Sequence, residues 1–141
     1  MLLPSTGALA QTAYPNQTVK IVVPFTAGSN TDILTRILAE KLGTVWKQTV
    51  IVENRPGIPG TVSVANSAPD GYTLMLTSNG HTILNVINRD LPVDPVKSFA
   101  GITPVATVPL VLIVTFWTSN VPAAWLKLPM VIATLTVMVP V

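Results

Sequence analysis

The residues best suited to binding chemistry form a short loop of small and polar residues, 26–30, which reads Thr-Ala-Gly-Ser-Asn. The loop follows a β-branched run at 19–25 and precedes a helical pattern. A buried strand that turns through glycine into a helix begins a βα unit, and open α/β sheets bind ligands at the carboxyl ends of such strands. The N–H groups of the loop and of the helix N-terminus would suit an anion. The pattern predicts either an anion-binding turn or a plain connection.

Other polar residues could be arranged for catalysis, but their spacing does not favour it. Ser78, His81 and Asp32 could form a triad on paper, yet the sequence has no nucleophile elbow. His81 is the only histidine and cysteine is absent, so neither a His-rich nor a thiolate metal site is expected. We therefore predict no catalytic residues, no metal and no cofactor.

A second loop, 53–60, reads ENRPGIPG. Its Arg55 could contact a carboxylate, although local pairing with Glu53 is the favoured interpretation. Gly57 and Gly60 do not form a phosphate-binding loop, because no Gly-Lys-Ser/Thr follows them. These glycines are expected to permit turns.

Composition limits the classes of protein to consider. The chain has 141 residues, enough for one domain, and 49% of them are apolar while 10% are charged. The net charge of +2 comes from scattered residues, so nucleic-acid binding is not expected. The absence of cysteine excludes disulfides. Thirteen prolines argue against long uninterrupted helices.

Periodicity predicts alternating strands and helices. Apolar runs predict strands at 19–25, 49–53 and 72–77, and helical spacing predicts helices at 31–48 and 61–67. Right-handed crossovers would place the three strands in one parallel sheet with helices on its faces. A short helix is predicted at 83–88, followed by strands at 99–108 and 110–114 that Pro104 and Pro109 interrupt. The fold class is α/β.

Several separate motifs occur in the order found in one known family. The chain resembles the N-terminal part of the Bug-type (TctC-like) periplasmic solute receptors, the substrate-binding components of tripartite tricarboxylate transporters. The resemblance covers about 14–114. It rests on Tyr14-Pro15, VVPFTAGSNTD at 22–32, ENRPGIPG at 53–60, APDGYTLML at 68–76, the 78–81 loop with Asn85, LPVDPVKSF at 91–99 and ITPVATVPLVLIV at 102–114.

The resemblance implies a fold and a way of binding. It implies the first lobe of a type II periplasmic binding protein, with a mostly parallel sheet flanked by helices. In such receptors a ligand carboxylate lies between two lobes, held by loop backbone groups, hydroxyls and bridging waters. Asp32 cannot attract an anion, so it is expected to fix the loop or to accept a hydrogen bond from the ligand. The implied ligand-binding residues are Phe25, Thr26, Ala27, Gly28, Ser29 and Asp32 from the first loop, and Ser78, Asn79 and His81 from the third.

The sequence departs from the family in three places. Ser29 stands where the family usually has a second loop glycine, and the segment from 60 to 68 is about three residues short, close to one helical turn. Residues 115–141 lack the polar helix and second lobe that would follow, so the second lobe is predicted to be missing. We interpret 1–13 as a truncated signal-peptide remnant or a disordered start, 14–114 as the lobe, and 115–141 as an atypical apolar tail. That tail could be a frameshift product, a hydrophobic anchor or a variant fold.

The predicted function is that of an exported, periplasmic receptor without enzymatic activity. It would capture a small organic acid for the membrane subunits of a tripartite tricarboxylate-type transporter, here in a truncated form with weak or no binding. The alternatives are a non-functional or membrane-tethered remnant and an enzyme that acts on a carboxylate.

Overall fold

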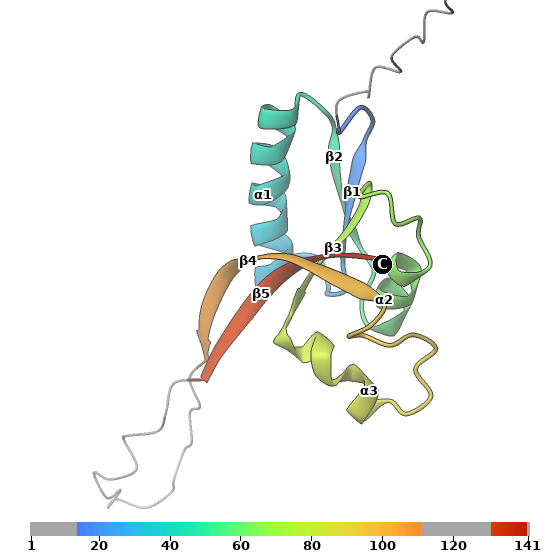
Figure 1. The fold of residues 1–141 in the computed structure, drawn as a ribbon. Coiled ribbons are helices and arrows are strands. Elements are labelled where there is room, and N and C mark those ends of the chain that lie inside the picture. Colours follow the sequence, from blue (N-terminus) through green and yellow to red (C-terminus); the bar gives the residue numbers. More distant parts are fainter. Residues whose placement is uncertain (1–13, 111–130, 141) are drawn as a thin grey trace, which may run out of the picture.

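The computed structural model describes residues 14–110 and 131–140. These residues form strands and helices in alternation, followed by two longer strands (Figure 1). The predicted N-terminal segment 1–13 lies outside the described residues, as do 115–130 and 141 of the predicted apolar tail 115–141. The elements are β1 (Val19–Val23), α1 (Asn30–Trp46), β2 (Val50–Asn54), α2 (Ile58–Ala65), β3 (Thr73–Ser78), the 3-10 turn η1 (Asn79–Ile83), α3 (Leu84–Ile87), β4 (Phe99–Leu110) and β5 (Val131–Pro140).

The strands form one mixed sheet in the order β2-β1-β3-β5-β4. β1 pairs in parallel with both neighbours, with Val22 opposite Glu53 on β2 and Met75 on β3. The predicted parallel arrangement of the first three strands is therefore confirmed. β5 runs antiparallel to β3 on one side and to β4 on the other.

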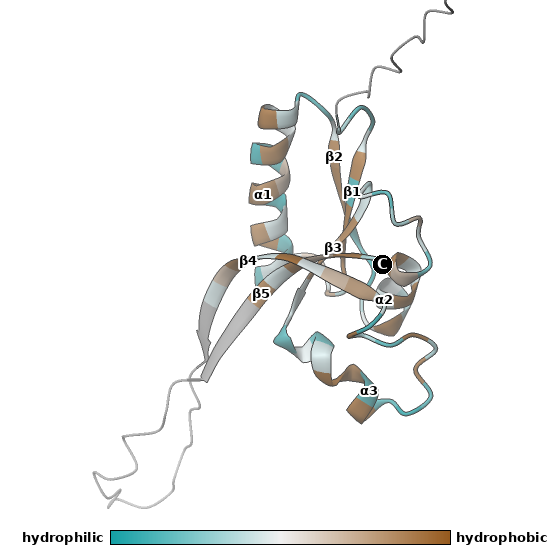
Figure 2. Ribbon diagram, viewed as in Figure 1, coloured by the Kyte–Doolittle hydropathy of each residue, from teal (hydrophilic) through white to brown (hydrophobic). Residues whose placement is uncertain are grey.

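Helices cover both faces of the sheet (Figure 1). Alternate residues of β1 point to opposite faces, so Ile21 packs in the core beneath α1 while Val22 packs with Val64 of α2. Apolar residues accordingly run along the strands (Figure 2). The core under α1 contains Val19, Ile21, Ala39, Leu74, Leu76, Leu135 and Val137.

The second half of the sheet differs from the prediction. The strand expected at 99–108 runs from Phe99 to Leu110 as β4, and neither Pro104 nor Pro109 ends it. Residues 111–114 of the strand expected at 110–114 lie outside the described residues. The prolines of β4 are tolerated because this strand lies at the edge of the sheet, where a missing N–H breaks no interior ladder. The later part of the apolar tail forms β5 between β3 and β4. Across the described ranges, no helix is long and apolar enough to cross a membrane.

Helix α2 begins earlier than predicted. The sequence places its start near Thr61, but the helix starts at Ile58, after Gly57 at the N-cap. Pro59 lies in the first turn, where the absence of its N–H costs no intrahelical hydrogen bond. The Pro-Gly-rich segment therefore contributes to a helix start as well as to a loop.

Candidate functional site

Three loops meet at the carboxyl-terminal ends of β1, β2 and β3, because these strands are parallel neighbours. Backbone hydrogen bonds join the first two loops: Arg55 N donates to Val23 O and Gly57 N donates to Pro24 O, each over 3.0 Å. β3 is the other neighbour of β1 and ends at Ser78, so the third loop follows Ser78 at the same end of the sheet. The topology thus brings together the loops that the sequence identified.

The β1–α1 loop is closed by internal hydrogen bonds. Gly28 has φ +81°, a conformation that favours glycine, and an added Cβ would meet open space there. Ser29 N donates to Thr26 O over 3.2 Å. Ser29 is also the N-cap of α1, since its Oγ accepts a hydrogen bond from Asp32 N over 3.2 Å. The serine that replaces the usual family glycine therefore starts the helix.

Asp32 holds this loop in place from beneath. Its side chain is buried, with the residue 3% exposed, and accepts hydrogen bonds from Gly28 N over 2.8 Å and from Asn54 Nδ2 over 3.0 Å. Arg36 Nε donates to the same carboxylate over 3.1 Å. The Arg36 hydrogen bond first, then those from Gly28 and Asn54, lower the pKa of Asp32 to about 2. Asp32 fixes the loop, which is one of the two roles expected for it.

The N-cap makes a first testable prediction. Replacing Ser29 with alanine leaves Asp32 N without its side-chain acceptor, so we expect the free energy of unfolding to fall by about 1 kcal/mol. Ser29→Gly should cost only a few tenths of that, because glycine is itself an acceptable N-cap. Chemical denaturation of both variants measures the difference. A Ser29→Ala variant as stable as the parent would show that the cap hydrogen bond contributes nothing.

His81 is buried rather than open to solvent. The residue is 2% exposed, its Nε2 lies 2.9 Å from Pro95 O, and its ring meets Phe99 edge-on with centroids 4.9 Å apart. A carbonyl only accepts, so Nε2 carries the proton and donates it. Burial lowers the pKa of His81, against the opposing effect of the Pro95 hydrogen bond. Nδ1 is left without a hydrogen-bond partner among the described residues.

The predicted site residues thus divide by exposure. Thr26, Ala27, Gly28 and Asn79 are exposed, whereas Asp32 and His81 are buried. Phe25, Ser29 and Ser78 are half-buried. Contact of any of these residues with a ligand remains a prediction.

Sequence reasoning missed two residues that support the loop. Arg36 lies one helical turn after Asp32 and pairs with it over 3.1 Å, a spacing that could have revealed it. Asn54 donates to both Asp32 and Phe25 O, the latter over 3.3 Å. Nothing local identifies Asn54, because its position depends on how β2 aligns with β1.

Arg55 behaves as the favoured interpretation states. Its Nε pairs with Glu53, and Lys20 Nζ lies 3.3 Å from the same carboxylate. The hydrogen bond from Arg55, and after it the one from Lys20, lower the pKa of Glu53. Within the part of the chain that the structure describes, no cluster of His, Cys, Asp or Glu could hold a metal ion.

A mixed α/β sheet flanked by helices, with loops gathered at the carboxyl edge, is the first-lobe architecture of periplasmic binding proteins. The structure of periplasmic binding protein BugD has a TM-score of 0.64 and 38% identity, over 68% of this chain and 33% of that one. R. palustris Rpa4515, solved with adipate, has a TM-score of 0.63 and 34% identity, over 68% of this chain and 33% of that one.

Sequence comparison identifies the family. The family "Tripartite tricarboxylate transporter family receptor" (TctC) matches residues 34–127, and the chain belongs to it. A UPF0065 protein of Bordetella bronchiseptica is 38% identical over 112 residues, which are 77% of this chain and 33% of that protein. The chain therefore spans about a third of the length of its relatives.

Proposed function

We propose that this chain is the first-lobe part of a periplasmic receptor that captures a small organic acid for a tripartite tricarboxylate-type transporter. The observation that carries the proposal is the preformed β1–α1 turn, fixed by Asp32 beside the N-terminus of a 17-residue helix. In this proposal the turn holds a ligand carboxylate without chemical turnover, and the membrane subunits of the transporter are the partners.

The internal hydrogen bonds of the turn decide which donors remain for a ligand. The amides of Gly28 and Ser29 already donate to Asp32 and Thr26. The first N–H groups of a helix have no intrahelical partner, so the amide of exposed Asn30 is available to an anion. The hydroxyl of Ser29 accepts from Asp32 N and keeps its own proton to donate.

The charges around the turn suit an anion despite the carboxylate beneath it. Arg36 compensates the charge of Asp32 through a direct ion pair. The partial positive charge at the helix N-terminus is then left to act on the ligand. We propose that Asp32 and His81 position the loops from the interior, and that the ligand contacts come from Phe25, Thr26, Ala27, Gly28, Ser29, Ser78 and Asn79.

The test is titration of the whole chain with dicarboxylates, with binding measured by amide NMR and by calorimetry. One lobe cannot enclose a ligand, so we expect adipate or malate to bind with a Kd of about 1 mM and to shift the amide resonances of Ser29 and Asn30. The matched control is 1,6-hexanediol, which has the length of adipate without its charge and should shift neither. If no acid shifts the loop resonances, the proposal is overturned. Submicromolar affinity would contradict an open half-site. Consumption of the acid would favour the alternative that the protein is an enzyme.

A further inference from the structure

Strand β2 is an edge of the sheet formed by the described residues, and its outer backbone groups have no partner strand among them. Val19 N donates to Thr49 O, and Arg55 N donates to Val23 O. Both hydrogen bonds use odd-numbered residues of this segment, and in a strand alternate residues direct their backbone groups to opposite sides. The N–H and C=O groups of Val50, Val52 and Asn54 therefore point away from β1. Among the described residues, no strand lies beyond them.

The two edges of the sheet differ in their protection against pairing. β4, at the far edge, contains Pro104 and Pro109, which remove N–H donors, and its register against β5 shifts in two places. Prolines and irregular register are devices that keep an edge from pairing with another chain. β2 reads VIVEN, without proline or a register shift against β1. It is the edge that remains able to accept a strand.

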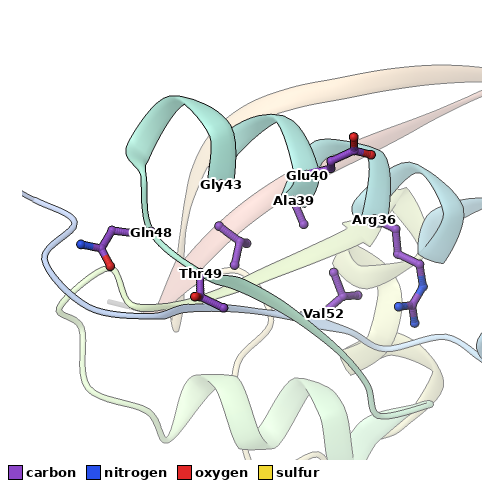
Figure 3. Close-up of a pocket in the computed structure, with 8 residues that line it drawn as sticks. Arg36, Ala39, Glu40, Gly43, Gln48, Thr49 and Val52 are labelled. Carbon is purple, nitrogen blue, oxygen red and sulfur yellow. The ribbon is translucent and has the colours of Figure 1, made fainter.

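A pocket lies between this edge and helix α1, with a volume of about 420 Å³ (Figure 3). Arg36 and Glu40 of α1 border it on one side, and Thr49 and Val52 of the β2 segment lie on the other. The small residues Ala39 and Gly43 leave room beneath the helix. The full lining is Arg36, Ala39, Glu40, Gly43, Gln48, Thr49, Val50 and Val52.

Helix α1 also exposes apolar residues next to this pocket. Ile33 is 50% exposed and Ile37 is 53% exposed. Ile33, Ile37 and Glu40 follow the spacing of one helix face, and Arg36, Glu40 and Gly43 follow that of the neighbouring one. The two faces share Glu40, so the isoleucines lie beside the pocket on the side away from the core.

We propose that a second copy of this chain docks on this surface, with the β2 strands of two copies paired antiparallel across a two-fold axis. With the axis at Val52, Val52 faces Val52 of the second copy and Val50 faces Asn54. These are the residues whose backbone groups point outward, so each pair can exchange both of its hydrogen bonds. The two sheets would join into one continuous sheet, and the two α1 helices would lie side by side above it.

Charge favours a second copy over another occupant. The pocket border carries one anion, Glu40, and one cation, Arg36, four residues apart on the same helix. Arg36 pairs with Asp32, but its side chain is still 54% exposed. Two α1 helices related by a two-fold axis run antiparallel, which brings Arg36 of each copy toward Glu40 of the other. The surface thus complements itself, as a two-fold interface must. Ile33, which is about 60° around the helix from Arg36, would lie at the rim of the same contact.

The first test is the mass of the full chain measured by sedimentation over a concentration series, with hydrogen exchange at each concentration. We expect a monomer–dimer equilibrium in which the amides of Val50, Val52 and Asn54 exchange more slowly as dimer forms. Ile51 and Glu53 donate within the monomer's own ladder and serve as internal controls. A chain that stays monomeric, or a dimer in which the three outward amides exchange freely, would overturn the proposal.

Two helix variants test the same contact without altering the strand. Glu40→Lys places a second cation beside Arg36 of the other copy, so we expect the dimer dissociation constant to rise by at least about tenfold. Lys41→Glu is the matched control, because it reverses a charge at an exposed position on another face of the same helix and should leave the constant unchanged. Equal effects of the two variants would contradict the proposed geometry. Ligand binding at the carboxyl edge is measured separately and does not decide this result.

Discussion

Gly60→Ala is expected to destabilise the fold by about 3 kcal/mol, since an added methyl group has no room. A Cβ on Gly60 would collide with the carbonyl oxygen of Arg55, which is backbone and cannot rotate away. Gly60 lies in the first turn of α2, so the collision separates this helix from the loop that follows β2. Urea denaturation monitored by circular dichroism measures the loss.

The control for this variant is Gly101→Ala on β4. An added Cβ at Gly101 meets nothing within 4 Å, so we expect its free energy of unfolding to stay within about 0.5 kcal/mol of the parent. If the two alanines cost the same, the tight approach of Gly60 to Arg55 is not what requires glycine.

Asp32→Asn is expected to cause the largest loss of stability among the carboxylate-to-amide variants. The replacement keeps one acceptor oxygen for Gly28 N, but its NH₂ group then faces two other donors, Asn54 Nδ2 and Arg36. Arg36 also loses its ion pair. Thermal unfolding near neutral pH measures the change. Asp90→Asn, at an exposed position, should have little effect, and comparable losses would refute the role given to Asp32.

The same carboxylate predicts a pH dependence with a definite sign. Asp32 has a pKa of about 2 in the folded chain, below the value of about 3.9 usual for aspartate in an unfolded one. Its contribution to stability is therefore complete above about pH 4 and is lost as the pH falls through 2. The difference in thermal midpoint between the parent and Asp32→Asn should narrow over that range. A constant difference down to pH 2 would show that the charge of Asp32 is not involved.

The first half of the fold could be predicted from local patterns. β1, α1, β2 and β3 each have the periodicity of their own element, and right-handed crossovers then leave few ways to arrange them. The same parallel arrangement predicts that the first and third loops lie together at the carboxyl-terminal ends of the strands. Support for Asp32 from Asn54 could not be predicted, because it depends on the alignment of β2 with β1 and on no feature near Asn54 itself.

The second half depends on pairing between distant segments, which local patterns do not show. Pro104 and Pro109 break a strand pattern when read alone, yet an edge position tolerates both. No local sequence pattern in residues 131–140 indicates that they pair with β3. They nevertheless pair antiparallel with it, from Met75 opposite Met138 to Ser78 opposite Leu135. The family resemblance implied His81 as a ligand-binding residue, and no local pattern showed its burial, which follows from packing against Pro95 and Phe99.

The position of β5 has a consequence for the order of folding. Among the described strands, β4 pairs with β5 alone, and β5 comes after it in the chain and lies between it and β3. Until residues 131–140 are in place, β3 is an open edge and β4 has no partner in the sheet. Such non-local pairing is slow, because the loop must close before the contacts form. β5 insertion is therefore expected to be the late step, and the period before it is when the open edge of β3 is exposed to aggregation.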